Sequence, residues 1–125
     1  MSINQKLFEI ASNHLIQQNA KSISTTSNGE FKKGLCLYRG DNGLKCAIGS
    51  LIGDEHYNKG IEGLDIGPGN IMSLISATHG VAPEEVDVEM LFTLQDIHDH
   101  HETSEWSNLL KEVSNKYGYN WNPNI

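Results

Sequence analysis

Cys46 and His98 are the two residues whose types could form a catalytic pair. Cys46 precedes an apolar run, 47–52, that fits a short helix, and the free N–H groups at a helix N-terminus stabilise a thiolate. A cysteine so placed, with a distant histidine, is the layout of cysteine hydrolases and acyl transferases. Asp96 or Asp99 could orient the imidazole of His98.

A buried, inert Cys46 is the competing interpretation. Its neighbours Leu44, Ala47 and Ile48 suit burial, and free cysteine is among the most buried residue types. No Gln or Asn stands out as an oxyanion donor. We therefore expect a protein that binds rather than catalyses, and keep as the alternative a small cysteine-dependent hydrolase or transferase using Cys46 and His98.

Three histidines, His98, His100 and His101, stand together among carboxylates. His98 and His101 lie one helical turn apart, a spacing that can chelate a metal ion. The chain has no HExxH motif, and His98 falls on an apolar helical stripe, which favours a hydrogen-bonded core histidine. We predict no metal site and no cofactor. Because histidine gains charge between pH 5 and 8, protonation of the cluster would partly neutralise the surrounding carboxylates.

Carboxylates are distributed unevenly along the chain. Residues 1–53 carry three against six Lys or Arg, a net of +3, whereas residues 54–125 carry thirteen against three, a net of −10. Like charges that close repel one another, and exposed helices usually gain from Glu–Lys pairs four residues apart. The densest stretch has eight acids with no Lys or Arg among them, and these are the candidate partner-binding residues: Glu84, Glu85, Asp87, Glu89, Asp96, Asp99, Glu102 and Glu105.

An acidic surface of this kind could imitate a row of nucleic-acid phosphates. It would then occupy a basic groove on a host protein, such as a nucleic-acid-binding defence complex, with an affinity that weakens as salt rises. The same pattern is also typical of a helix face that is only solvated.

Composition excludes several classes of protein. A chain of 125 residues is the size of one domain, and its net charge of −7 argues against direct nucleic-acid binding. No apolar run approaches the roughly 20 residues of a membrane span, and the N-terminus lacks the order of a signal peptide. We expect a cytoplasmic protein with reduced thiols at Cys36 and Cys46.

Hydrophobic periodicity predicts an α+β fold, mainly helical, with four or five helices packed against one small β-hairpin in a single domain over 1–125. Ser2, Asn70 and Ser104 are the expected N-caps, and Gly118 is the expected helix stop. Tyr119, Trp121 and the rest of the tail should fold back on the core. The expected elements are a helix over 3–18, a hairpin over 34–48, a Gly-rich loop over 53–70, and helices over 71–79, 84–101 and 105–117.

Two blocks of sequence form a recognisable pattern. The first runs from Cys36 to Ile52 (CLYRGDNGLKCAIGSLI), followed by Tyr57 and Glu62-Gly63, and the second is Leu94 to Asp99 (LQDIHD), followed by Trp106. The pattern resembles small uncharacterised proteins encoded by tailed bacteriophages and prophages, over roughly residues 34–113. The resemblance implies a phage origin, and so the cytoplasm of the bacterial host, but no activity. Since many small phage proteins inhibit host defence or metabolism, we expect an anti-CRISPR or other anti-defence inhibitor acting through its acidic surface.

Overall fold

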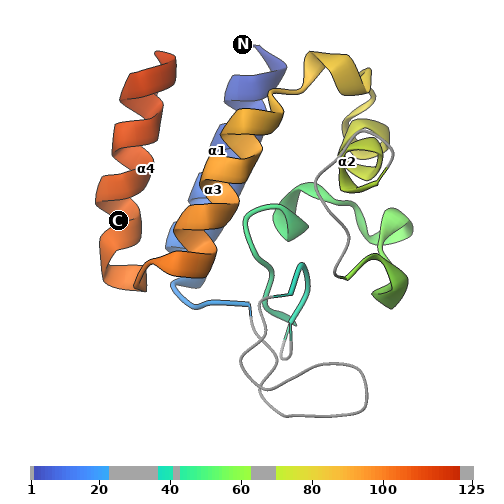
Figure 1. The fold of residues 1–125 in the computed structure, drawn as a ribbon, viewed down its shortest axis with the longest axis horizontal. Helices are drawn as coiled ribbons and strands as arrows, with labels where there is room; N and C mark the ends of the chain where they lie inside the picture. The colour runs from blue at the N-terminus through green and yellow to red at the C-terminus, as the bar shows by residue number, and fades with distance from the viewer. Residues whose placement is uncertain (1, 23–36, 41–42, 63–69, 122–125) are drawn as a thin grey trace.

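A computed structural model describes residues 2–22, 37–40, 43–62 and 70–121 (Figure 1). Three helices lie side by side as a bundle, and a fourth, α2, is seen end-on across from α4. Short 3-10 turns connect them. The helices are α1 (Ile3–Gln18), α2 (Ile71–His79), α3 (Val88–His100) and α4 (Thr103–Tyr117), and the turns are η2 (Gly49–Leu51), η3 (Asp54–His56), η4 (Lys59–Ile61) and η5 (Pro83–Glu85).

Helix α1 has the bounds that periodicity predicts. The Ser2 hydroxyl accepts a hydrogen bond from the N–H of Gln5 at 3.1 Å, which satisfies one free donor of the first turn. The buried side chains recur at helical spacing, and the helix ends at Asn19 in the left-handed conformation, with φ 48°. The buried side chains of α1 are Leu7, Phe8, Ala11, Ser12 and Leu15.

The start of α3 differs from the prediction. The expected helix 84–101 is divided into η5 and α3, because Val86 is extended and Asp87 caps a new helix by accepting from the N–H of Met90 at 3.2 Å. Carboxylates in this position also suit the positive end of the helix dipole.

Helix α4 begins two residues before its predicted start. Glu102 is its N-cap in place of Ser104, and the Glu105 carboxylate accepts the N–H of Glu102 at 3.1 Å. Gly118 ends the helix as predicted, with φ 72°. Helix α2 has its predicted bounds, although the side chain of its N-cap, Asn70, makes no capping hydrogen bond.

The predicted β-hairpin is wrong. The described parts of 34–48 contain no strand, only an isolated antiparallel bridge between Arg39 and Lys45, followed by turns that lead into η2. Residues 34–36 and 41–42 of the expected hairpin lie outside the described part of the chain. Two backbone bonds join the arms, from the N–H of Gly40 to the carbonyl of Leu44 at 2.9 Å and from the N–H of Cys46 to the carbonyl of Tyr38 at 3.2 Å. Helix side chains hold other backbone groups: Gln18 bonds both the N–H and the carbonyl of Lys45, and Gln95 accepts the N–H of Ile48.

Further side chains hold this irregular segment to the helices. His14 on α1 bonds the carbonyl of Lys45 at 2.9 Å, and His79 on α2 bonds the carbonyl of Leu51 at 3.1 Å. Thr78 accepts the N–H of Gly53 at 2.9 Å. Side chains from three helices thus pair backbone groups of this segment that do not bond to one another.

Glu62 belongs to the same segment and forms hydrogen bonds with three of its other residues. Its carboxylate accepts the N–H of Tyr38 at 2.8 Å, the N–H of Arg39 at 3.1 Å and the hydroxyl of Tyr57 at 2.6 Å. The Arg39 guanidinium lies 4.5 Å from the centre of the Tyr57 ring. Burial raises the pKa of Tyr57, and the bond to Glu62 adds to this. Part of the expected loop 53–70 is therefore ordered as η3 and η4, whereas 63–69 lies outside the described residues.

Tyr119 and Trp121 fold back on the core beside α1, as predicted, whereas 122–125 lies outside the described residues. The ring of Phe8 lies 5.3 Å from that of Tyr119 and 5.7 Å from that of Trp121. The Trp121 indole donates to Asn13 at 2.9 Å. Among the described residues, no helix is long and apolar enough to cross a membrane.

Candidate partner-binding surface

The outward side of α3 presents an aromatic side chain among carboxylates. Phe92 is 53% exposed, and it is the one exposed large hydrophobic residue in the part of the chain that the structure describes. Glu89 and Asp96 stand three residues before it and four after it, so both are its neighbours on the helix surface. We call Glu89, Phe92 and Asp96 the α3 outer face.

Several of the candidate carboxylates accept hydrogen bonds from backbone N–H groups at the starts of helices. Glu85 accepts the N–H of Ala82 at 2.9 Å, Asp87 caps α3, and Glu105 accepts the N–H of Glu102. Because Glu84 and Glu85 belong to η5 rather than to α3, the eight acids do not share one helix face.

The remaining carboxylates are less engaged. The structure pairs the side chains of Glu84, Glu89 and Glu102 with no other described residue, and all three are exposed. Within the described chain, the one ion pair that joins a carboxylate to Arg or Lys is Arg39–Asp54, at 2.8 Å. No Lys or Arg among the described residues therefore forms an ion pair with the negative charge on α3 and at the start of α4.

Asp96 is the carboxylate that lies closest to two of the three histidines, His100 and His101. Its oxygens lie 2.8 Å from Nδ1 of His100 and 3.9 Å from Nε2 of His101, and Nδ1 of His101 lies 3.9 Å from Glu105. Among the described residues, no group of three His, Cys, Asp or Glu side chains could hold a metal ion.

His98 lies in the core, with both ring nitrogens occupied. Its Nε2 accepts the N–H of Ser22 at 2.9 Å, so the proton of the neutral ring resides on Nδ1, which donates to Asp99 at 2.7 Å. The ring stacks on Trp106 at 5.6 Å. Asp99 also accepts the amide of Gln95 at 2.8 Å and is half-buried, so this carboxylate supports the core.

Cys46 is fully buried and does not bond to His98. Its Sγ accepts the N–H of Gly49 at 3.3 Å. Burial raises the pKa of the Cys46 thiol to about 12, so the thiol stays protonated at neutral pH. Neither nitrogen of His98 is free to take its proton. These are the features of a structural cysteine, and they disfavour the cysteine-enzyme alternative.

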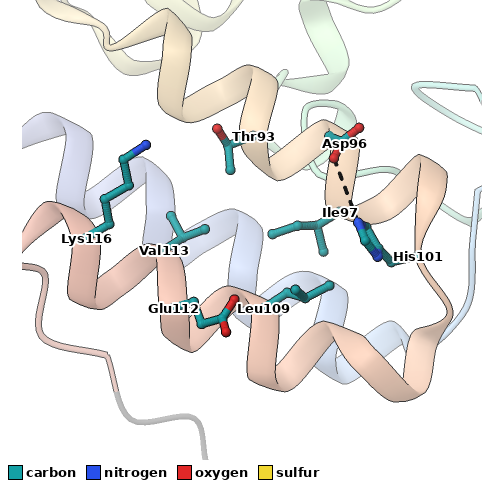
Figure 2. A pocket seen from close by; sticks show the side chains of 8 residues that line it. All are labelled: Thr93, Asp96, Ile97, His101, Leu109, Glu112, Val113 and Lys116. Atoms are coloured by element: carbon teal, nitrogen blue, oxygen red, sulfur yellow. Dashed lines mark ion pairs between the residues drawn. The ribbon is translucent and has the colours of Figure 1, made fainter.

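A groove between α3 and α4 was not anticipated from the sequence (Figure 2). It encloses about 270 Å³. The periodicity of α3 and α4 placed their apolar residues on core stripes, and it does not predict a groove between the two helices. The lining residues are Thr93, Asp96, Ile97 and His101 on the α3 side, and Leu109, Glu112, Val113 and Lys116 on α4. A second hollow of about 190 Å³ lies beside Met72, Pro83, Glu84 and Val86.

No protein-family model, curated protein or solved structure matches the chain. Its function is therefore inferred from its own residues and their geometry.

Proposed function

We propose that this protein binds another protein through the α3 outer face and inhibits it. The observation that carries the proposal is Phe92, 53% exposed between Glu89 and Asp96. Exposing an aromatic ring has no benefit to the isolated fold, whereas aromatic side chains surrounded by polar residues are the usual anchors of protein interfaces.

The charge on α3 and at the start of α4 indicates the kind of surface that the partner presents. Glu89, Asp96, Glu102 and Glu105 are exposed, and no Lys or Arg of the described chain pairs with them. A basic surface would be steered to this face and oriented on it, with the affinity falling as salt rises. The proposed partner is therefore a host protein with a basic, nucleic-acid-binding surface.

The biological setting of the proposal rests on the resemblance to tailed-phage proteins. In that setting the protein is a phage accessory protein acting in the cytoplasm of the bacterial host. Its target would be a defence complex that handles nucleic acid, and an anti-CRISPR role is the leading instance.

Affinity capture of the tagged protein from host lysate, read by mass spectrometry at low and moderate salt, tests the proposal. We expect a stoichiometric partner with a basic groove, lost as salt rises. Phe92→Ala should weaken its capture by about 30-fold, the effect of losing an interface anchor of ~2 kcal/mol. Charge reversal by Glu89→Lys should also weaken it.

Glu55→Lys is the matched control, because Glu55 is an exposed carboxylate on η3, outside the α3 outer face. The control should keep the partner. The captured partner should also lose its affinity for nucleic acid when the protein is added. No partner at either salt, or a partner retained equally by Phe92→Ala and Glu89→Lys, would contradict the proposal.

A further inference from the structure

The groove between α3 and α4 has an apolar floor. Ile97 is 4% exposed and Val113 is 6% exposed, and Leu109 on α4 is partly buried beside them. Its volume of about 270 Å³ is below the usual range for pockets that enclose a small-molecule ligand. A single long side chain is an occupant of suitable size.

The walls of the groove carry carboxylates from both helices. Asp96 stands on the α3 side and Glu112 on the α4 side, with His101 beside Asp96 and Lys116 at the far end (Figure 2). With Asp96 and Glu112 negative and Lys116 positive, the formal charge of the groove is −1 at neutral pH. Asp96 is paired only with histidines, and the side chain of Glu112 has no partner among the described residues.

We infer that this groove receives an arginine side chain of the partner protein. The methylene stem of arginine packs on an apolar floor while its head stays at the polar rim. The guanidinium carries five N–H donors in a planar fork, so it suits carboxylates better than the compact ammonium of lysine does. A purely apolar side chain would leave the Glu112 carboxylate unpaired and Asp96 with its histidine partners alone. The inference rests on the proposed function for the source of the arginine.

Titration of the ¹⁵N-labelled protein with N-acetyl-argininamide, followed by NMR, tests the groove directly. We expect amide shifts that concentrate on Thr93, Ile97, Leu109 and Val113. N-acetyl-citrullinamide has nearly the same shape without the charge and should give several-fold weaker binding. N-acetyl-lysinamide should also bind more weakly. The inference would be overturned if the citrulline or the lysine compound bound as tightly as argininamide. Amide shifts located elsewhere in the protein would also overturn it.

Charge variants of the walls sharpen the test. Asp96→Asn and Glu112→Gln keep the side-chain shape and should each weaken argininamide by about two- to fivefold, the usual effect of a partly exposed charge pair. Lys116→Gln removes the competing cation and should tighten binding by a similar factor. Glu55→Gln should change nothing. If Lys116→Gln binds argininamide no more tightly than the unaltered protein, and Asp96→Asn and Glu112→Gln bind it equally well, charge does not determine binding in the groove.

The same variants separate this inference from the proposed function. If Phe92→Ala abolishes capture of the partner but Glu112→Gln does not affect it, the proposed function is supported and the arginine inference is contradicted. Argininamide binding in the groove, with no partner captured from lysate, would keep the groove and contradict the proposed function.

Discussion

The helical bundle and the irregular segment 37–62 pair their backbone polar groups in different ways. In α1, α3 and α4 the backbone bonds itself, and side chains are left to form the core. In segment 37–62, outside the undescribed 41–42, the backbone bonds itself only in short turns and at one isolated bridge. Side chains of other elements take further backbone groups, as Gln18, His14 and His79 do. The bundle therefore tolerates change on its outward sides, whereas the segment depends on particular distant side chains.

The proposed binding surface lies in the bundle, on the outward side of α3. The side chains of Glu89, Phe92 and Asp96 hold no backbone group of another described element. They can therefore be exposed without leaving a backbone group unpaired. The polar side chains at segment 37–62 are already engaged, as Glu62 and Arg39 illustrate. A solvent-facing helix surface is the more adaptable place for recognition.

The largest expected effect is in the bundle. Trp106→Ala should lower the free energy of unfolding by about 3–5 kcal/mol, because it leaves a cavity in the core and removes the stack on His98 and the indole bond to the carbonyl of His101. Urea unfolding measures the loss. Trp106→Phe, which keeps an aromatic ring, should cost clearly less, and equal losses would show that packing at Trp106 does not dominate.

A smaller loss is expected in the segment from Gly49→Ala. A Cβ at Gly49 would overlap the backbone carbonyl of Tyr38, which accepts the N–H of Cys46 at 3.2 Å. Backbone must then shift, and we expect a loss of about 1–3 kcal/mol in urea unfolding. Gly60→Ala is the control, because the added atom meets only the side-chain oxygen of Asn58. A Gly49→Ala protein as stable as the control would refute the close approach.

Acid should loosen segment 37–62 through the histidines of α1 and α2 that bond to it. Burial lowers the pKa of His14 and of His79 below the ordinary value of about 6.5. The unfolded chain therefore binds more protons, so stability is full above about pH 6.5 and falls as pH drops through the lowered pKa values. Urea unfolding at pH 7.5 and pH 5 measures the fall. A His14→Gln/His79→Gln double variant should show a flatter dependence, and an equally steep one would contradict the assignment.

The smallest effect on stability is expected on the α3 outer face. Phe92→Ala should change the free energy of unfolding by less than about 0.5 kcal/mol, because the ring is 53% exposed and completes no part of the core. The same variant is expected to lose the partner. A large loss of stability would instead assign Phe92 to packing and remove the observation on which the proposed function rests.

The sequence by itself determined the helices. Apolar spacing and the Ser2 cap set α1, and apolar spacing with a closing glycine set α2, because these signals lie within a few residues of one another along the chain. The buried state of Trp121 also followed from local composition. The position of Asp87, a good capping residue, could have indicated the later start of α3.

Only the tertiary structure decided the rest. The runs around Cys46 have strand-like composition, but in their described parts they pair only at the isolated bridge between Arg39 and Lys45. Gln18, 27 residues from Lys45, and Gln95, 47 residues from Ile48, bond other backbone groups there. Periodicity ranks a residue as inward or outward without stating what neighbouring helix covers it, so the groove beside Asp96 could not be predicted. The groove depends on how α3 and α4 pack, which is settled by contacts between residues distant in sequence.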